Sequence, residues 1–113
     1  MELIRDSVSL AHLQELAAAM YGDLVKAVVD VKGETMVIGG ELHSDEEAML
    51  LDHGAGQANV WGINLYPGRH GTPDFIEYDS MINVRPSQGN RSRSVEDVGL
   101  QAEIARIVEK RVR

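Results

Sequence analysis

The chain has 113 residues, of which 43% are hydrophobic, and a formal net charge of −7. This length is typical of one domain, and the apolar content is enough for a single packed core. The negative charge argues against general nucleic-acid binding, which depends on many Lys and Arg side chains that neutralise phosphates. No apolar run approaches the roughly 18 residues of a membrane span, and the N-terminus is acidic where a signal peptide would be basic. We therefore predict one soluble, unprocessed cytoplasmic domain over residues 1–113.

The charges are distributed unevenly along the chain. Residues 1–83 hold four basic and fourteen acidic side chains, net −10, whereas residues 84–113 hold seven basic and four acidic ones, net +3. We expect these two parts to attract each other. The absence of cysteine excludes disulfides, thiolate metal sites and a cysteine nucleophile, and it is consistent with a reducing compartment.

The first half of the chain predicts a helix followed by a hairpin. Ser9 is the expected N-cap of an amphipathic helix that ends near Gly22, with apolar residues three or four apart at Leu10, Leu13, Ala17 and Met20. Residues 24–31 alternate and are rich in β-branched side chains, as in a strand. A turn at residues 32–34 leads to a second short strand at 35–40. Leu3 and Ile4 are candidates for an additional edge strand.

A second helix is predicted from about Asp45 to His53. Ser44 followed by Glu47 is a capping-box pattern, and Gly54 is the expected end. We expect the inward face of this helix to hold Ala48, Leu51 and Ala55.

The second half predicts another hairpin, with strands at residues 60–66 and 75–86, and then a helix capped by Asp97. The long second strand would expose one side to solvent or to a ligand, and that side holds Glu77, Asp79, Met81, Asn83 and Arg85. The predicted fold class is therefore α+β: an antiparallel sheet of about four strands, in the order α-ββ-α-ββ-α, with three helices mainly on one face.

Three stretches of the sequence are similar to those of a small family of prokaryotic domains of unknown function. They are GGELHSDEEAMLL (39–51), WGINLYP (61–67) and IEYDSMINVRPSQGNRSRSVED (76–97). The resemblance covers nearly the whole chain. It implies no activity, cofactor or catalytic residue.

The polar run after the predicted long strand is the main candidate binding site. Three guanidinium groups lie among amides and hydroxyls there, as in sites that hold phosphate or carboxylate. The predicted ligand-binding residues are Asn83, Arg85, Gln88, Asn90, Arg91 and Arg93, with Ser92 beside them. The pattern is neither a Walker loop nor a dinucleotide fingerprint. In the alternative interpretation, these arginines pair with the acidic part of the same chain.

Two carboxylates and one histidine are the candidate catalytic residues. Glu77 and Asp79 are two apart on a predicted strand and so face the same way, which can raise the pKa of one of them. His70 is a candidate general acid or base if its loop folds over the arginines. We favour a solvated or ion-paired face over catalysis as the explanation of the two carboxylates.

The histidines do not predict a metal site. His43 and His53 bracket the second predicted helix, with Glu41 or Asp52 as further conceivable ligands, but no pair has the spacing of a metal-binding helix. We predict no metal and no cofactor.

Three functions of different class follow from these patterns. The first is a binding domain that holds an anionic or phosphate-bearing ligand with the Arg/Asn/Gln loop. The second is a small hydrolase, such as a phosphoesterase or nuclease, that uses Glu77, Asp79 or His70. The third is a protein-interaction or homodimerising module with Tyr66 or Tyr78 as aromatic anchors.

Overall fold

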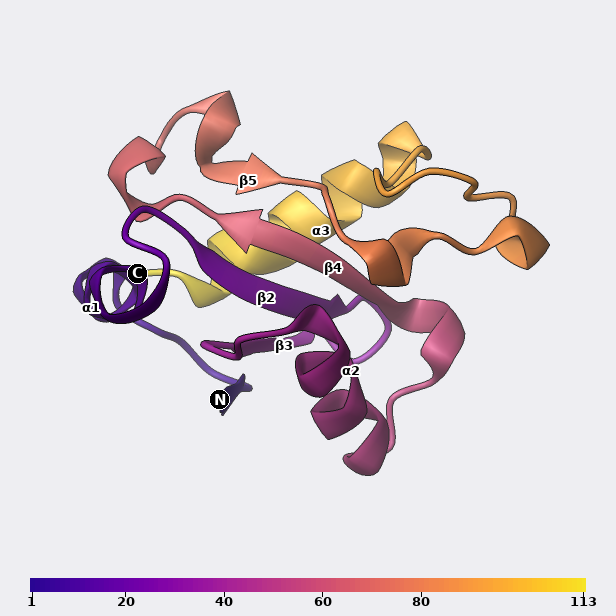
Figure 1. Cartoon of the computed structure of the whole chain (residues 1–113), viewed down its shortest axis with the longest axis horizontal. Coiled ribbons are helices and arrows are strands. Elements are labelled where there is room, and N and C mark those ends of the chain that lie inside the picture. The colour runs from indigo at the N-terminus through magenta and orange to yellow at the C-terminus, as the bar shows by residue number, and fades with distance from the viewer.

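The computed structural model describes all residues, Met1–Arg113, as a five-stranded antiparallel sheet with helices on both faces (Figure 1). The strands are β1 (Glu2–Ile4), β2 (Val25–Asp30), β3 (Thr35–Ile38), β4 (Val60–Leu65) and β5 (Ile76–Glu77), and the helices are α1 (Leu10–Met20), α2 (His43–Asp52) and α3 (Val98–Arg111). The strand order is β1-β3-β2-β4-β5. The predicted α+β class is confirmed, and β1 is the additional edge strand. None of the helices has both the length and the apolar character of a membrane span.

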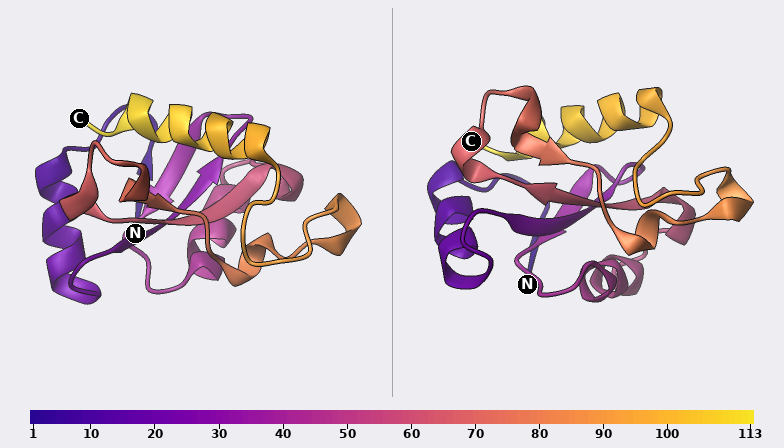
Figure 2. Two further views of the ribbon diagram at one scale, coloured as in Figure 1. Left: turned by 90° about the horizontal axis from the view of Figure 1, so that it is seen from above. Right: turned by 45° about the horizontal axis from the view of Figure 1, so that its top comes forward.

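Successive side chains along each strand point to opposite faces of the sheet, and both faces are buried by helices. On one face, residues such as Val29 and Ile63 pack with α1 and α3 in the larger core. On the opposite face, Val28 and Val60 pack with Leu50 of α2. Figure 2 shows α3 and α2 on opposite sides of the sheet. The expectation that the three helices lie mainly on one face therefore holds for α1 and α3, whereas α2 covers the opposite face.

The predicted caps of α1 and α3 are present. The Ser9 hydroxyl accepts a hydrogen bond from His12 N at 3.0 Å, and the Asp97 carboxylate accepts one from Leu100 N at 3.2 Å. Gly22, just after α1, has a φ of +90°, a conformation that glycine adopts without strain. These local signals were sufficient to place both helix starts.

The start and the inward face of α2 differ from the prediction. Its N-cap is Leu42, and no side chain caps it, so the Ser44 capping box is not formed. The buried residues of α2 are His43, Glu46 and Leu50, whereas Ala48 is exposed. The prediction failed because two polar side chains, an imidazole and a carboxyl group, occupy positions that pattern reasoning reserves for apolar residues.

The second predicted hairpin is much shorter than expected. β5 pairs only Glu77 and Ile76 with Asn64 and Leu65 of β4. Residues 81–83 instead form a 3-10 turn that is capped by Ser80, whose hydroxyl accepts from Ile82 N at 3.2 Å. The proposed exposed side of a long strand therefore does not exist.

The positive C-terminal part does pair with the acidic part of the chain. Glu34, in the turn between β2 and β3, accepts from Arg106 at 3.0 Å and from Lys110 at 3.1 Å. These two partners lower the pKa of Glu34 to about 2. The contacts tie α3 to the sheet, and the predicted attraction between the two parts is confirmed.

The segment before α1 also pairs with the end of α3. Val8 forms a parallel bridge with Val112, in which Val8 N donates to Arg111 O at 2.8 Å and Arg113 N donates to Val8 O at 2.9 Å. Residues from opposite ends of the sequence are therefore bonded side by side.

Candidate functional site

Two amides of the predicted binding loop hold the loop itself together. The fully buried Asn83 side chain donates to Gly62 O at 2.9 Å and accepts from Gly62 N at 2.8 Å. The buried Asn90 amide donates to the carbonyls of Asn83, Ser92 and Ser94 at 2.7–3.1 Å. Both side chains were expected to face a ligand, but their hydrogen-bonding groups are satisfied within the chain.

Arg85 has a similar internal role. Its guanidinium is only 9% exposed and lies 4.5 Å from the centre of the Trp61 ring. Its hydrogen-bond acceptors lie in several segments of the chain: Ile82 O at 3.0 Å, Gln57 O at 2.7 Å, Val60 O, and the Glu47 carboxylate at 3.5 Å. Burial lowers the pKa of Arg85 below its usual value. This residue therefore connects the loop to β4 and α2.

The backbone of the loop already binds a carboxylate of the same chain. Glu96 Oε2 accepts from Arg91 N at 2.8 Å and from Ser92 N at 2.7 Å. Neighbouring N–H groups of this kind form anion sites in many proteins. Gln88 donates to Ala58 O at 3.2 Å. The Arg91 guanidinium makes no hydrogen bond or ion pair within the chain, so anion binding by this loop stays a prediction that rests on Arg91.

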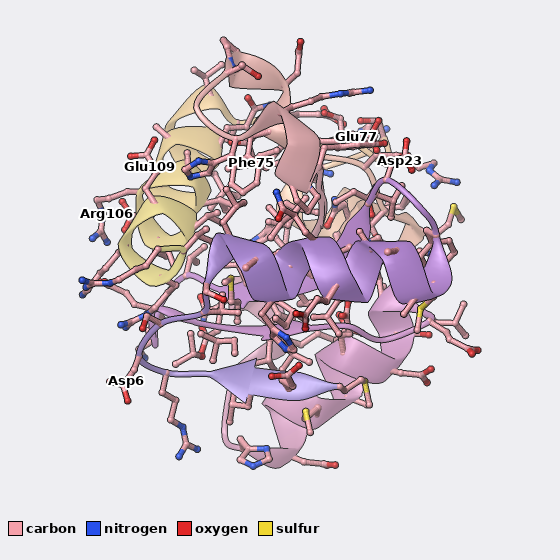
Figure 3. All side chains as sticks on the ribbon, turned by 90° about the vertical axis from the view of Figure 1, so that its left-hand side faces the viewer. Asp6, Asp23, Phe75, Glu77, Arg106 and Glu109 are labelled. Atoms are coloured by element: carbon pink, nitrogen blue, oxygen red, sulfur yellow. The ribbon has the colours of Figure 1, made fainter.

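The candidate catalytic residues do not converge. Glu77 accepts from the Asn64 amide at 2.8 Å and from the Tyr66 hydroxyl at 3.1 Å. The His70 ring packs perpendicular to the Phe75 ring, with the ring centres 4.9 Å apart, and Phe75 belongs to the core on the α1 and α3 face. Figure 3 shows Glu77 pointing away from the side on which Phe75 packs.

Asp79 forms a bidentate ion pair with Arg93, at 2.8 and 3.3 Å. The alternative in which the arginines pair with the acidic part of the chain therefore describes Arg93 and Arg85.

The burial of two polar residues of α2 was not predicted from the sequence. His43 lies against Ile63 O, with Nε2 at 2.7 Å, and burial lowers its pKa. Glu46 is fully buried, and its Oε2 accepts from Gly40 N at 3.0 Å. Burial raises the pKa of Glu46 to about 9, so its carboxyl group is protonated at neutral pH. Nothing in the sequence pattern distinguishes Glu46 from its exposed acidic neighbours.

A polar cleft lies at the other end of α2. It has a volume of about 620 Å³, within the usual range for small-ligand sites, between the turn that joins β2 to β3 and residues 53–56 after α2. Leu3 and Leu50 supply apolar lining, and Thr35 and Asn59 supply a hydroxyl and an amide. No residue of this cleft was among the predicted ligand-binding residues.

Two positive charges line this cleft without a partner. The basic residues that form ion pairs in the chain are His12, Arg85, Arg93, Arg106 and Lys110. Arg5 and Lys32, which line the cleft, are not among them. Both cations are therefore available to a negatively charged ligand at this cleft.

The one carboxylate at the cleft is engaged by the backbone. Asp30 is 7% exposed, and its Oδ1 accepts from Lys32 N at 3.1 Å. A Cβ atom on Gly33 would lie 2.6 Å from Asp30 Oδ2, so a larger residue at this position would displace the Asp30 carboxylate. Asp30 therefore fixes the turn that carries Lys32.

His53 lies on the opposite wall of the cleft. Its Nδ1 is 2.8 Å from Met49 O, which leaves Nε2 free for a ligand. His53 and His43 are at opposite ends of α2, and no group of three or more His, Asp or Glu residues in the chain is placed to hold a metal ion. The sequence predicted only a helix end at Gly54 for this wall and treated His53 as a conceivable metal ligand.

The fold and the cleft together define a small α+β domain with a polar ligand-sized cavity. Residues 2–111 match the family described as "Protein of unknown function (DUF5674)". The chain belongs to this family, and the resemblance to a family of unknown function is confirmed. No curated protein and no solved structure matches the chain.

Proposed function

We propose that this protein is a binding domain for a small anionic ligand, and that the ligand binds in the cleft lined by Arg5 and Lys32. The observation that carries the proposal is the pair of cations without ion-pair partners in a cleft of about 620 Å³. Guanidinium and ammonium groups bind phosphate and carboxylate by charge-assisted hydrogen bonds. The function predicted from the sequence is kept, but its location moves away from the arginine loop.

The other side chains of the cleft indicate how a ligand is recognised. His53 Nε2, the Thr35 hydroxyl and the Asn59 amide are polar groups at the same cavity, and such groups fix the orientation of a ligand. A phosphate or carboxylate group would lie between Arg5 and Lys32, with the remainder of the ligand against Leu3 and Leu50.

Ligand titrations of matched variants test both the function and its location. The probes are inorganic phosphate, sulfate and a panel of nucleoside monophosphates, measured by thermal shift and calorimetry. A ligand that binds only the folded state raises the melting temperature. We expect stabilisation of the wild-type protein that is lost in the double variant Arg5→Gln/Lys32→Gln.

Arg91→Gln is the matched control, because it removes an exposed, unpaired guanidinium from the arginine loop. We expect this variant to bind as the wild type does. Loss of binding in Arg91→Gln but not in the double variant would return the site to the loop. If no anion in the panel binds at millimolar concentration, the proposed function is wrong.

A further inference from the structure

A second hollow, of about 710 Å³, lies between α3 and the segment of residues 70–78. It is on the face of the sheet covered by α3, so it is separate from the cleft of Arg5 and Lys32 on the α2 face. Figure 3 shows Phe75 and Glu109 on its two sides, one below the connection from β4 to β5 and the other on α3.

The lining of this groove is mainly aromatic and aliphatic. Phe75 is 5% exposed, and the His70 ring packs perpendicular to its ring. Tyr78 is held in place by its hydroxyl, which donates to Gln101 O at 3.0 Å, and Val112 adds an aliphatic surface. The groove is therefore lined by aromatic and aliphatic side chains, of which Phe75 and Val112 contribute only a small exposed area.

Glu109 is the only acidic residue that lines the groove, and its charge is not neutralised. Arg106 and Lys110 of α3 are engaged by Glu34. Glu109 itself forms no ion pair within the chain. Burial raises the pKa of Tyr78, and the negative charge of Glu109 raises it further, which indicates that the carboxylate and Tyr78 are neighbours.

We propose that this groove binds a small molecule that consists of an apolar ring and a protonated amine. The ring would pack on Phe75, Tyr78 and Val112, and the amine would pair with Glu109. Aromatic walls favour both parts, because ring faces attract cations and ring edges pack well against other rings. This proposal is independent of anion binding at the other cleft.

The test is a pair of probes with the same ring and opposite charge, phenethylamine and 3-phenylpropionate, titrated into isotope-labelled protein and followed by amide NMR shifts. We expect phenethylamine to shift the amides of residues 70–78 and 105–112, with an affinity at least tenfold higher than that of the acid. Equal affinity of the two probes, or shifts confined to other regions, would overturn the proposal.

Two variants give the control. Glu109→Gln should weaken phenethylamine binding by about tenfold, whereas Glu41→Gln, which removes one carboxylate from the distant loop before α2, should leave it unchanged. Thermal melts of both variants verify that they are folded. An unchanged affinity in Glu109→Gln would contradict the assigned role of this carboxylate.

Discussion

The side-chain amide of Asn83 pairs with the backbone of Gly62 as a neighbouring strand would, accepting from Gly62 N at 2.8 Å and donating to Gly62 O at 2.9 Å. β5 is too short to reach Gly62, since it pairs only with Asn64 and Leu65. A Cβ atom at position 62 would lie 2.5 Å from Ser80 Cβ. The Asn83 side chain therefore completes the hydrogen bonds of β4 on the side where β5 does not reach.

We expect Asn83→Ala to lower the free energy of unfolding by about 3 kcal/mol, because buried backbone groups of Gly62 would lose their partners. Gly62→Ala should cost about 2 kcal/mol through overpacking against Ser80. Urea denaturation measures both. Gly68→Ala is the control, since its Cβ atom would meet nothing within 4 Å. Equal stability of the two glycine variants would disprove this account.

Arg85→Lys should be as damaging as the loss of a core residue. A lysine cannot reproduce the contacts of a guanidinium with three backbone carbonyls, and we expect a loss of about 3 kcal/mol. Arg91→Lys, at an exposed position, should change stability by less than about 0.5 kcal/mol. Chemical denaturation measures the free energy of unfolding of both variants. Equal losses in the two variants would show that Arg85 has no special structural role.

The buried Glu46 predicts a stability that falls with pH. Its pKa is about 9 in the folded protein and 4.5 as an ordinary value, so the folded state binds more protons than the unfolded state between these values. Stability is therefore highest below about pH 4.5 with respect to this group, and it declines by up to about 1.4 kcal/mol per pH unit as pH rises toward 9.

Glu46→Gln tests this pH dependence, because it keeps the shape of the side chain and removes the titration. Thermal or urea unfolding between pH 5 and 9 should show a flatter profile for the variant than for the wild type. Parallel profiles would show that Glu46 is not the group responsible.

The cations of the proposed anion cleft should be dispensable for stability. Arg5 and Lys32 are exposed and form no ion pair, so Arg5→Gln and Lys32→Gln should each change the free energy of unfolding by less than about 0.5 kcal/mol. Binding of phosphate-bearing ligands by the wild type should weaken as salt rises. Calorimetry at low and high ionic strength measures that effect. A marked loss of stability in either variant would indicate a structural role instead.

The helices and the first four strands were predictable because their signals are local. Ser9 and Asp97 act as caps where expected, and the alternation in β2 and β4 places these strands correctly. The region after β5 was not predictable in this way. Its conformation depends on contacts such as Asn83 with Gly62 that join distant positions, and no periodicity in the sequence encodes them.

The candidate sites also differ in whether local sequence signals predict them. The arginine loop was prominent in the sequence, yet Arg85 and Arg93 are engaged within the chain. The cleft that we propose as the anion site combines Arg5, Lys32 and His53, which lie in three separate segments. Only the pairing of β1 with β3, and the position of α2 above the sheet, brings them together.

The bridge between Val8 and Val112 has a consequence for how the chain folds. Closing a contact between opposite ends of the sequence costs more chain entropy than closing a local one, and topologies rich in such contacts fold slowly. Until α3 docks, the apolar face that holds Val29 and Ile63 lacks part of its cover. We expect docking of α3 to be a late step, and the partly folded chain to be prone to aggregation before that step is complete.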